Sequence, residues 1–228
     1  TRHLSVMIRL LLGAVFNGVT HHVLCTVQCI MKSAPVLSSS HFHAMDGLAL
    51  VVDALLREDA PPTTPKDTPA MRMHSGLSVI SQHVRSLQAL ALDTTWEGGG
   101  GVEMMGTRRG GVPPLRERLV SLLLRAVQSE EWEAHEDAIF EYATDVARRL
   151  ADGGGVLECV TGGARAWRDA VLRSGLCDAA RRKRGRCSDV SDTVWQRVYA
   201  MCEADNALPP DGGAGRCEAV PSLDEDTK

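Results

Sequence analysis

The chain has 228 residues, of which 44% are hydrophobic, so it is long enough to bury a core as one large domain or two small ones. Aromatic residues make up only 4%, which favours aliphatic helix faces over the aromatic and β-branched alternation of sheets. The formal net charge of -4 argues against an extended basic surface for nucleic acid, and the apolar content argues against disorder of the whole chain.

Two apolar patterns of helical spacing open the chain. The first runs from Leu4 to Phe16 and the second from Val23 to Met31, with Asn17-Gly18 between them, so we expect a helical hairpin. Charged and imidazole side chains interrupt this stretch, and the sequence therefore predicts no transmembrane segment.

No acidic residue precedes Asp46, whereas three basic residues do. Acid-poor, Arg-bearing amphipathic starts are typical of organellar transit segments, although a buried helical pair also lacks acids and is the interpretation we prefer. The chain begins at Thr1 without Met, which is consistent with processing or with a fragment of a longer protein. The early basic residues are Arg2, Arg9 and Lys32.

The middle of the chain predicts two further helices. Ser38 to Ser40 can supply the N-cap of a third helix, which has His41 and His43 near its start and continues through Leu55 to a Pro-rich break. Residues 60–70 are then a linker. The next helix has the clearest seam, with apolar residues three and four apart at Leu77, Ile80, Val84, Leu87 and Ala91.

Glycine runs in residues 94–112 predict a flexible loop between an N-terminal helical subdomain, residues 1–93, and a C-terminal one, residues 113–207. Pro114 suits the first turn of the helix that follows. Residues 208–228 are rich in Pro, Gly and acids and predict a disordered tail.

The C-terminal subdomain predicts three more helices. Ser129 is expected to cap the first of them, with Trp132 on its buried stripe and three glutamates in its first turn, and with Arg148 and Arg149 in its last turn. A second spans Ala164 to Arg173 and is closed by Gly175, and a third spans Ser191 to Cys202. The glutamates are Glu130, Glu131 and Glu133.

Helical pairs that begin near His3, Ser40, Pro113 and Gly162 suggest αα units of roughly 35 to 45 residues, and in the size of these units the chain resembles HEAT- or armadillo-like α-helical repeats. The resemblance covers Leu4–Leu56 and Leu115–Leu150. It implies an all-α fold in which antiparallel αα-hairpins stack as a short irregular solenoid, while an irregular helical bundle would give the same pattern and stays open.

The His and Cys clusters predict no site. His21, Cys25 and Cys29 share one helical face, but ligands two turns apart lie about 12 Å apart and cannot wrap a tetrahedral metal ion. His41 and His43 are two residues apart and point to different faces, so they cannot converge on one substrate atom. No phosphate-binding loop, nucleophile elbow or zinc-protease motif occurs either, and we expect no enzyme, no cofactor and no metal.

Cysteines cluster near the C-terminus. Cys177-x9-Cys187 resembles half of the twin Cys-x9-Cys motif of intermembrane-space proteins, which implies two disulfides between antiparallel helices. The second pair, Cys202 and Cys217, has a different spacing, and the total of seven cysteines is odd, so we expect reduced structural thiols.

One dense basic run suggests a phosphate contact, to RNA or to a lipid headgroup, or a nuclear signal. A solvated interhelix loop is the alternative, because Asp178 and Asp189 flank the run and no aromatic residue interleaves with it. The candidate residues are Arg181, Arg182, Lys183, Arg184 and Arg186.

The sequence therefore favours a non-catalytic helical scaffold or interaction subunit that binds other protein subunits, within a larger complex or a larger protein. One alternative is an RNA-contacting structural component of a mitochondrial ribonucleoprotein. Another comes from Val27–Leu56, which resembles the C-terminal HEAT-like region of large Arf guanine-nucleotide exchange factors and would imply a regulatory or membrane-recruitment segment. We expect an intracellular protein, with mitochondrion and cytoplasm both open.

Overall fold

The computed structural model describes residues 2–17, 21–57, 67–91, 113–129, 132, 135–152, 161–184 and 196. Within these residues the protein is all-α, as predicted, and contains no strand. The helices are α1 (Arg2–Asn17), α2 (His21–Ser33), α3 (Pro35–Ala44), α4 (Gly47–Leu56), α5 (Pro69–Ala91), α6 (Leu115–Gln128), α7 (Glu136–Asp152), α9 (Ala164–Ser174) and α10 (Leu176–Arg184).

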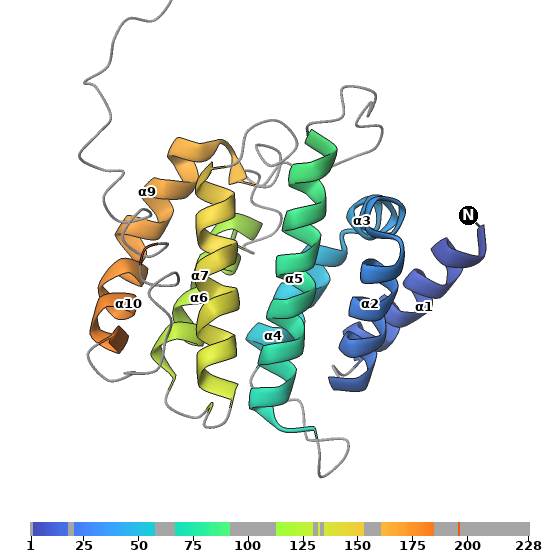
Figure 1. Cartoon of the computed structure of the whole chain (residues 1–228), viewed down its shortest axis with the longest axis horizontal. Coiled ribbons are helices and arrows are strands. Elements are labelled where there is room, and N and C mark those ends of the chain that lie inside the picture. The colour runs from blue at the N-terminus through green and yellow to red at the C-terminus, as the bar shows by residue number, and fades with distance from the viewer. Residues whose placement is uncertain are drawn as a thin grey trace, which may run out of the picture.

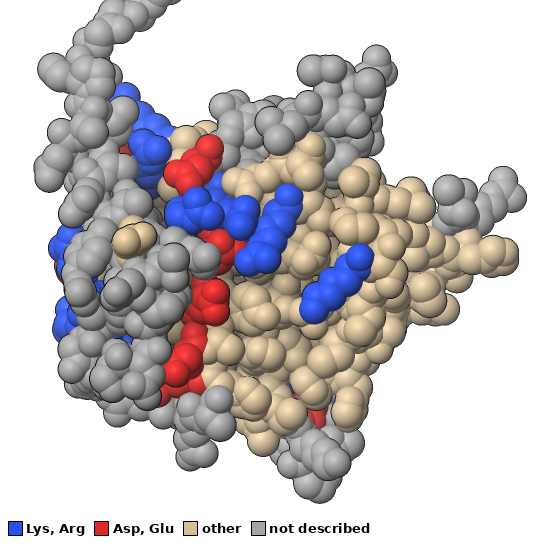
Figure 2. Space-filling model, in the orientation of Figure 1, with Lys and Arg blue, Asp and Glu red and all other residues tan. Residues whose placement is uncertain are grey.

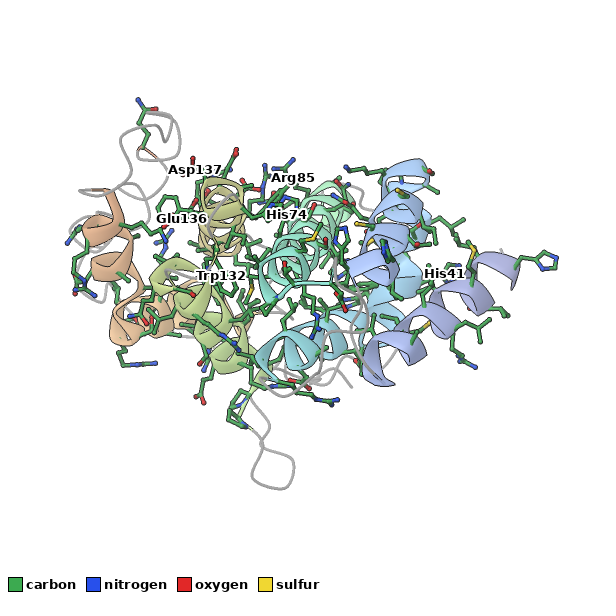
Figure 3. The ribbon with its side chains drawn as sticks, turned by 90° about the horizontal axis from the view of Figure 1, so that it is seen from below. His41, His74, Arg85, Trp132, Glu136 and Asp137 are labelled. Atoms are coloured by element: carbon green, nitrogen blue, oxygen red, sulfur yellow. The ribbon has the colours of Figure 1, made fainter. Side chains whose placement is uncertain are left out.

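The helices form two rows. Helices α2, α5 and α7 lie side by side in one row, and α1, α4 and α6 lie behind them in the other (Figures 1 and 3). Helices α9 and α10 cover the α6–α7 end, while α1 lies at the opposite end. Each of the consecutive helices α4 to α7 therefore packs on helices of its own row and of the other.

Helices α5 and α7 run parallel to each other, and so do helices α4 and α6. Between α5 and α7, the His74 ring lies 5.3 Å from that of His135, and Arg85, further along α5, reaches Asp145, further along α7. Between α4 and α6, Arg118 pairs with Asp53, and Arg125, two turns later, donates to the carbonyl of Leu56 at 3.4 Å. Within each of these two pairs, the chain thus runs in the same direction in both helices.

A single buried cluster of apolar side chains runs through both predicted subdomains. The predicted seam of α5 is confirmed at Leu77, Ile80, Val84 and Leu87, all fully buried, while the side chain of Ala91 lies outside the described set. Trp167 of α9 closes the far end, and its indole Nε1 donates to the Ala147 carbonyl at 2.9 Å.

The expected third helix is in fact two helices. The chain turns at Met45 and Asp46, and Asp46 adopts a left-handed φ of 54° before α4 begins at Gly47. A Cβ on Gly47 would lie 2.6 Å from the Phe42 ring, so only glycine allows this close approach. His41 and His43 consequently lie in the last turn of α3 rather than near a helix start.

Helix α5 begins inside the predicted linker. Pro69 is its first residue, and the Thr68 hydroxyl accepts a hydrogen bond from the Met71 backbone N–H at 3.2 Å, as an N-cap does. Buried Asp67 accepts the first backbone N–H of α2, from His21 at 2.9 Å, and pairs with Arg72 at 3.1 Å. Asp67, within the expected linker, therefore bonds the start of α2 to the first turn of α5.

Helix α7 begins at Glu136, seven residues after the predicted cap at Ser129. Ser129 instead ends α6, and Trp132 folds back so that its indole Nε1 donates to the Ala126 carbonyl at 2.9 Å. Glu136 and Asp137 supply the acidic first turn. The three predicted glutamates of that turn lie outside the described residues.

Helix α9 matches the predicted range, whereas α10 was not predicted and makes the described part of the basic run helical, where an interhelix loop was the alternative. Helix α9 ends at Gly175, which has a left-handed φ of 77°. The predicted loop at 94–112, the helix at 191–202 apart from the helical residue 196, and the tail at 208–228 lie outside the described residues. No described helix is both long enough and apolar enough to cross a membrane.

Candidate functional site

The structure divides the predicted basic run between the surface and the interior. Arg181 and Arg182 are exposed on α10, with Arg181 3.7 Å from Asp178. Lys183 is buried, pairs with Glu136 and donates to the Ser129 carbonyl at 3.2 Å. The Arg184 side chain and Arg186 lie outside the described set. Lys183 thus ties α10 to the α6–α7 connection, and the predicted phosphate contact stays a prediction for the two exposed arginines.

The histidine and cysteines of α2 meet α5. His21 Nδ1 lies 2.6 Å from the Ser75 hydroxyl, and Cys25 Sγ lies 3.6 Å from the same ring. Asp67 accepts a hydrogen bond from the His21 backbone N–H at 2.9 Å. Over the described residues no group of three or more His, Cys, Asp or Glu can hold a metal ion, and Cys29 is exposed.

His83 of α5 is completely buried, against α3. Its ring lies 4.8 Å from that of Phe42 and 5.8 Å from that of His43. Desolvation by burial, and then the nearby His43, lower the pKa of His83 to about 3. Burial also lowers the pKa of His43, against the opposing charge of Asp46. The α3–α5 contact therefore contains neutral imidazole at physiological pH.

Asp145 forms a charged network between α5 and α7. The carboxylate is buried, and its Oδ2 accepts hydrogen bonds from Ser81 at 3.1 Å, from Arg85 Nη2 at 3.0 Å and from Arg149 Nε at 2.9 Å. Arg148 Nη2 lies 3.6 Å from the other oxygen. Three guanidinium groups thus converge on one carboxylate, and we call Arg85, Arg148 and Arg149 the arginine cluster.

The surroundings of Asp145 keep it charged. Burial by itself raises the pKa of this carboxyl, but hydrogen bonds from Arg149 and Arg85, together with their positive charges, outweigh burial and lower it. Gln88 extends the network, because its Oε1 accepts from Arg149 Nη1 at 2.7 Å. Figure 2 shows the resulting gathering of basic side chains over α5 and α7.

The opposite end of the molecule offers an apolar surface. Figure 2 shows mostly uncharged side chains over α1 to α3 on the face it presents. The large hydrophobic side chains that are exposed in the described part of the chain all lie on α1 and α3, which pack against each other. We call them the α1–α3 apolar surface, and they are Val6, Met7, Leu10, Val36 and Leu37.

An open depression of about 540 Å³ lies between α4 and α6. Its lining includes Asp53 and Arg118, which pair with each other, and Glu117 on the same helix as Arg118. Because its strongest charges compensate each other, this depression attracts neither an anion nor a cation strongly.

Comparison of the chain with protein-family models, with curated proteins and with solved structures gives no match.

The structure contains two surfaces that the sequence did not predict, the arginine cluster and the α1–α3 apolar surface. Arg148 and Arg149 were expected only to complement the end of a helix, and their spacing from Asp145, three and four residues, was the signal for the arginine cluster. For the apolar surface, the signal was the excess of apolar residues around α1.

Proposed function

We propose that this protein is a non-catalytic helical interaction subunit that docks a helix of a partner protein on the α1–α3 apolar surface. The observation that carries the proposal is the concentration of the exposed large hydrophobic side chains of the described residues on these two helices. Leu10 is the most exposed of them, at 70%. Large apolar side chains exposed together on two packed helices mark interaction sites, whereas single exposed apolar residues are ordinary.

The arrangement of the helices supports a repeat-like scaffold. Parallel neighbours in two rows are what stacked αα-hairpins produce, and α1 lies at an end of the array (Figure 1). Terminal helices of such arrays usually have a polar outer face that keeps them in solution. Because the outer face of α1 is apolar, we infer that a further helix continues the array there.

The partner helix has a definite chemistry. No acidic residue precedes Asp46. Two exposed basic residues are close in sequence to the residues of the α1–α3 apolar surface: Arg9 precedes Leu10, and Lys32 lies four residues before Val36. A complementary helix would carry an apolar stripe flanked by Asp and Glu, since opposite charges at the rim speed association and select partners. Each apolar side chain buried on docking contributes about 1 to 2 kcal/mol before the cost of association is subtracted.

Paired variants test this proposal. The double variant Val6→Ser with Leu10→Ser removes apolar area from exposed positions of α1, so the fold should keep its circular dichroism spectrum and melting temperature. We expect proteins that co-purify with the wild type from its native cell to be lost from this variant. The control Arg182→Gln, at an exposed position on α10, should retain them.

Two results would contradict the proposal. One is a double variant that retains every partner, and the other is a wild-type protein that sediments as a lone monomer in native extracts. A homodimer that the double variant dissociates would assign the surface to a second copy of this chain instead.

RNA contact through α10 is the second candidate, favoured by the exposure of Arg181 and Arg182 on one helix. The inward position of Lys183 and the net charge of -4 weaken it. If single-stranded RNA binds at low salt and the double variant Arg181→Ala with Arg182→Ala abolishes binding, this candidate replaces the first. Absence of binding at low salt would remove it.

A further inference from the structure

The arginine cluster is held in place before any ligand arrives. Arg85 uses Nε and Nη2 on Asp145, and Arg149 uses Nε on Asp145 and Nη1 on Gln88. These contacts fix the planes of both guanidinium groups. Since an ordered arginine loses little side-chain entropy on binding, a ligand of matching geometry gains most of the interaction energy.

Two donors of the cluster are left over, and Arg85 is accessible from outside. Within the described part of the chain, Arg85 Nη1 and Arg149 Nη2 have no hydrogen-bond partner, and the Arg85 side chain is 46% exposed. Figure 3 places Arg85 on the outer side of α5, away from the α4–α6 row. Both guanidinium groups touch the same oxygen of Asp145, so they lie beside each other.

The charge of the cluster calls for an anion. Arg148 has its own carboxylate, Asp152, at 3.0 Å, while Arg85 and Arg149 share the single negative charge of Asp145. One positive charge is therefore left over at a partly exposed site. An oxyanion with several terminal oxygens, such as a phosphomonoester, satisfies both guanidinium groups better than a carboxylate does.

The surroundings favour a single phosphate over a polyanion. Asp137 and Glu141 are exposed on α7, two and one turns before Asp145 on the same side of the helix. Figure 2 shows acidic side chains continuing along α7 below the basic ones. A nucleic-acid strand that extended from the cluster in this direction would meet like charge, whereas one phosphorylated side chain would not.

We propose that Arg85 and Arg149, oriented by Asp145, bind a phosphorylated serine or threonine of the partner protein. This proposal rests on the proposed function, because it supplies a second contact for the same kind of partner. Recognition of phosphorylated motifs by arginine clusters needs this chemistry: ordered guanidinium groups, excess positive charge and an accessible outer edge.

The test uses a five-residue peptide, acetylated and amidated, that has phosphoserine at its centre and alanine elsewhere. Arginine Nε–Hε signals in ¹H–¹⁵N spectra of the wild-type chain report binding directly, and the variants Arg85→Gln and Arg149→Gln assign the two signals. We expect saturable shifts of these two signals by the phosphopeptide and none by its unphosphorylated form. Arg85→Gln should weaken binding at least tenfold, while Arg182→Gln should leave it within twofold.

Several results would overturn the proposal. They are the absence of saturable shifts in the wild type, equal binding of inorganic phosphate and the phosphopeptide, and tighter binding of single-stranded RNA to the same signals. The wild-type spectra decide the question even if Arg85→Gln fails to fold. The titration needs no partner protein, and the Val6→Ser, Leu10→Ser variant should bind the peptide normally, so this proposal and the proposed function fail separately.

Discussion

The buried imidazole of His83 makes the folding stability of the protein depend on pH. In the unfolded chain this side chain takes up a proton near pH 6.5, whereas the folded protein, in which burial and then His43 lower the pKa to about 3, excludes that proton. The contribution of His83 to stability is therefore fully present above pH 6.5 and is lost progressively as the pH falls toward 3.

The size of the effect follows from the pKa difference. Each pH unit below the unfolded pKa costs about 1.4 kcal/mol for one excluded proton, so His83 alone lowers the free energy of unfolding by about 2 kcal/mol at a pH of about 5. The variant His83→Leu has a side chain of similar size and removes two ring nitrogens that are buried without a hydrogen-bond partner in the described structure.

Urea denaturation of the wild type and of His83→Leu, followed by far-ultraviolet circular dichroism at about pH 7.5 and about pH 5, measures this difference. We expect the wild type to lose about 2 kcal/mol more than the variant on acidification. His74, whose pKa is also lowered by burial, is present in both proteins and cancels. His3→Gln, at an exposed position of α1, serves as the control. Equal losses in the wild type and His83→Leu would refute the reasoning.

Two further predictions concern packing and charge. Gly76→Ala should lower the free energy of unfolding by about 1 to 3 kcal/mol, because the added Cβ would lie 2.3 Å and 2.8 Å from the two methyl carbons of Leu55. Gly13→Ala should raise the free energy of unfolding by up to about 1 kcal/mol, because the added Cβ would meet nothing within 4 Å. Asp145→Asn should cost about 3 kcal/mol by leaving the arginines around a neutral group, while the half-exposed Asp152→Asn should cost less than about 1 kcal/mol. Urea denaturation measures the free energy of unfolding of all four variants. Equal losses of stability in the two variants of a pair would contradict the reasoning for that pair.

Helices were predictable wherever packing follows local spacing. The seam from Leu77 to Leu87 is buried on every predicted position, since a helix that packs lengthwise on its neighbours needs apolar residues three and four apart. The turn at Asp46-Gly47 was not predicted: Asp-Gly favours a turn, but the apolar residues on both sides led to the prediction of one continuous helix. The predicted helix boundaries were therefore wrong where a turn lies within a run of apolar residues.

The start of α7 could not be predicted from local patterns. Trp132 fits the helical stripe of α7 by spacing, yet in the structure its indole donates to the Ala126 carbonyl of α6, and α7 begins only at Glu136. That contact joins residues six apart, outside the three- and four-residue spacing from which the helix was predicted. A tertiary contact of this kind outweighs helix propensity, which differs by only a few tenths of a kcal/mol between most residues.

The arginine cluster shows why a site is harder to predict than a helix. Ser81, Arg85 and Gln88 follow one another by four and three residues on α5, beside the apolar seam, and in the sequence they read as the solvent-facing stripe of an amphipathic helix. Nothing local indicates that Ser81 is buried while Arg85 is half exposed. That gradient arises only because Asp145 of α7 lies beside the stripe, and it orients Arg85 from within while leaving its outer edge accessible. The feature that distinguishes this stripe from an ordinary polar face is therefore a single carboxylate about 60 residues away, which the parallel arrangement of α5 and α7 brings into register with it.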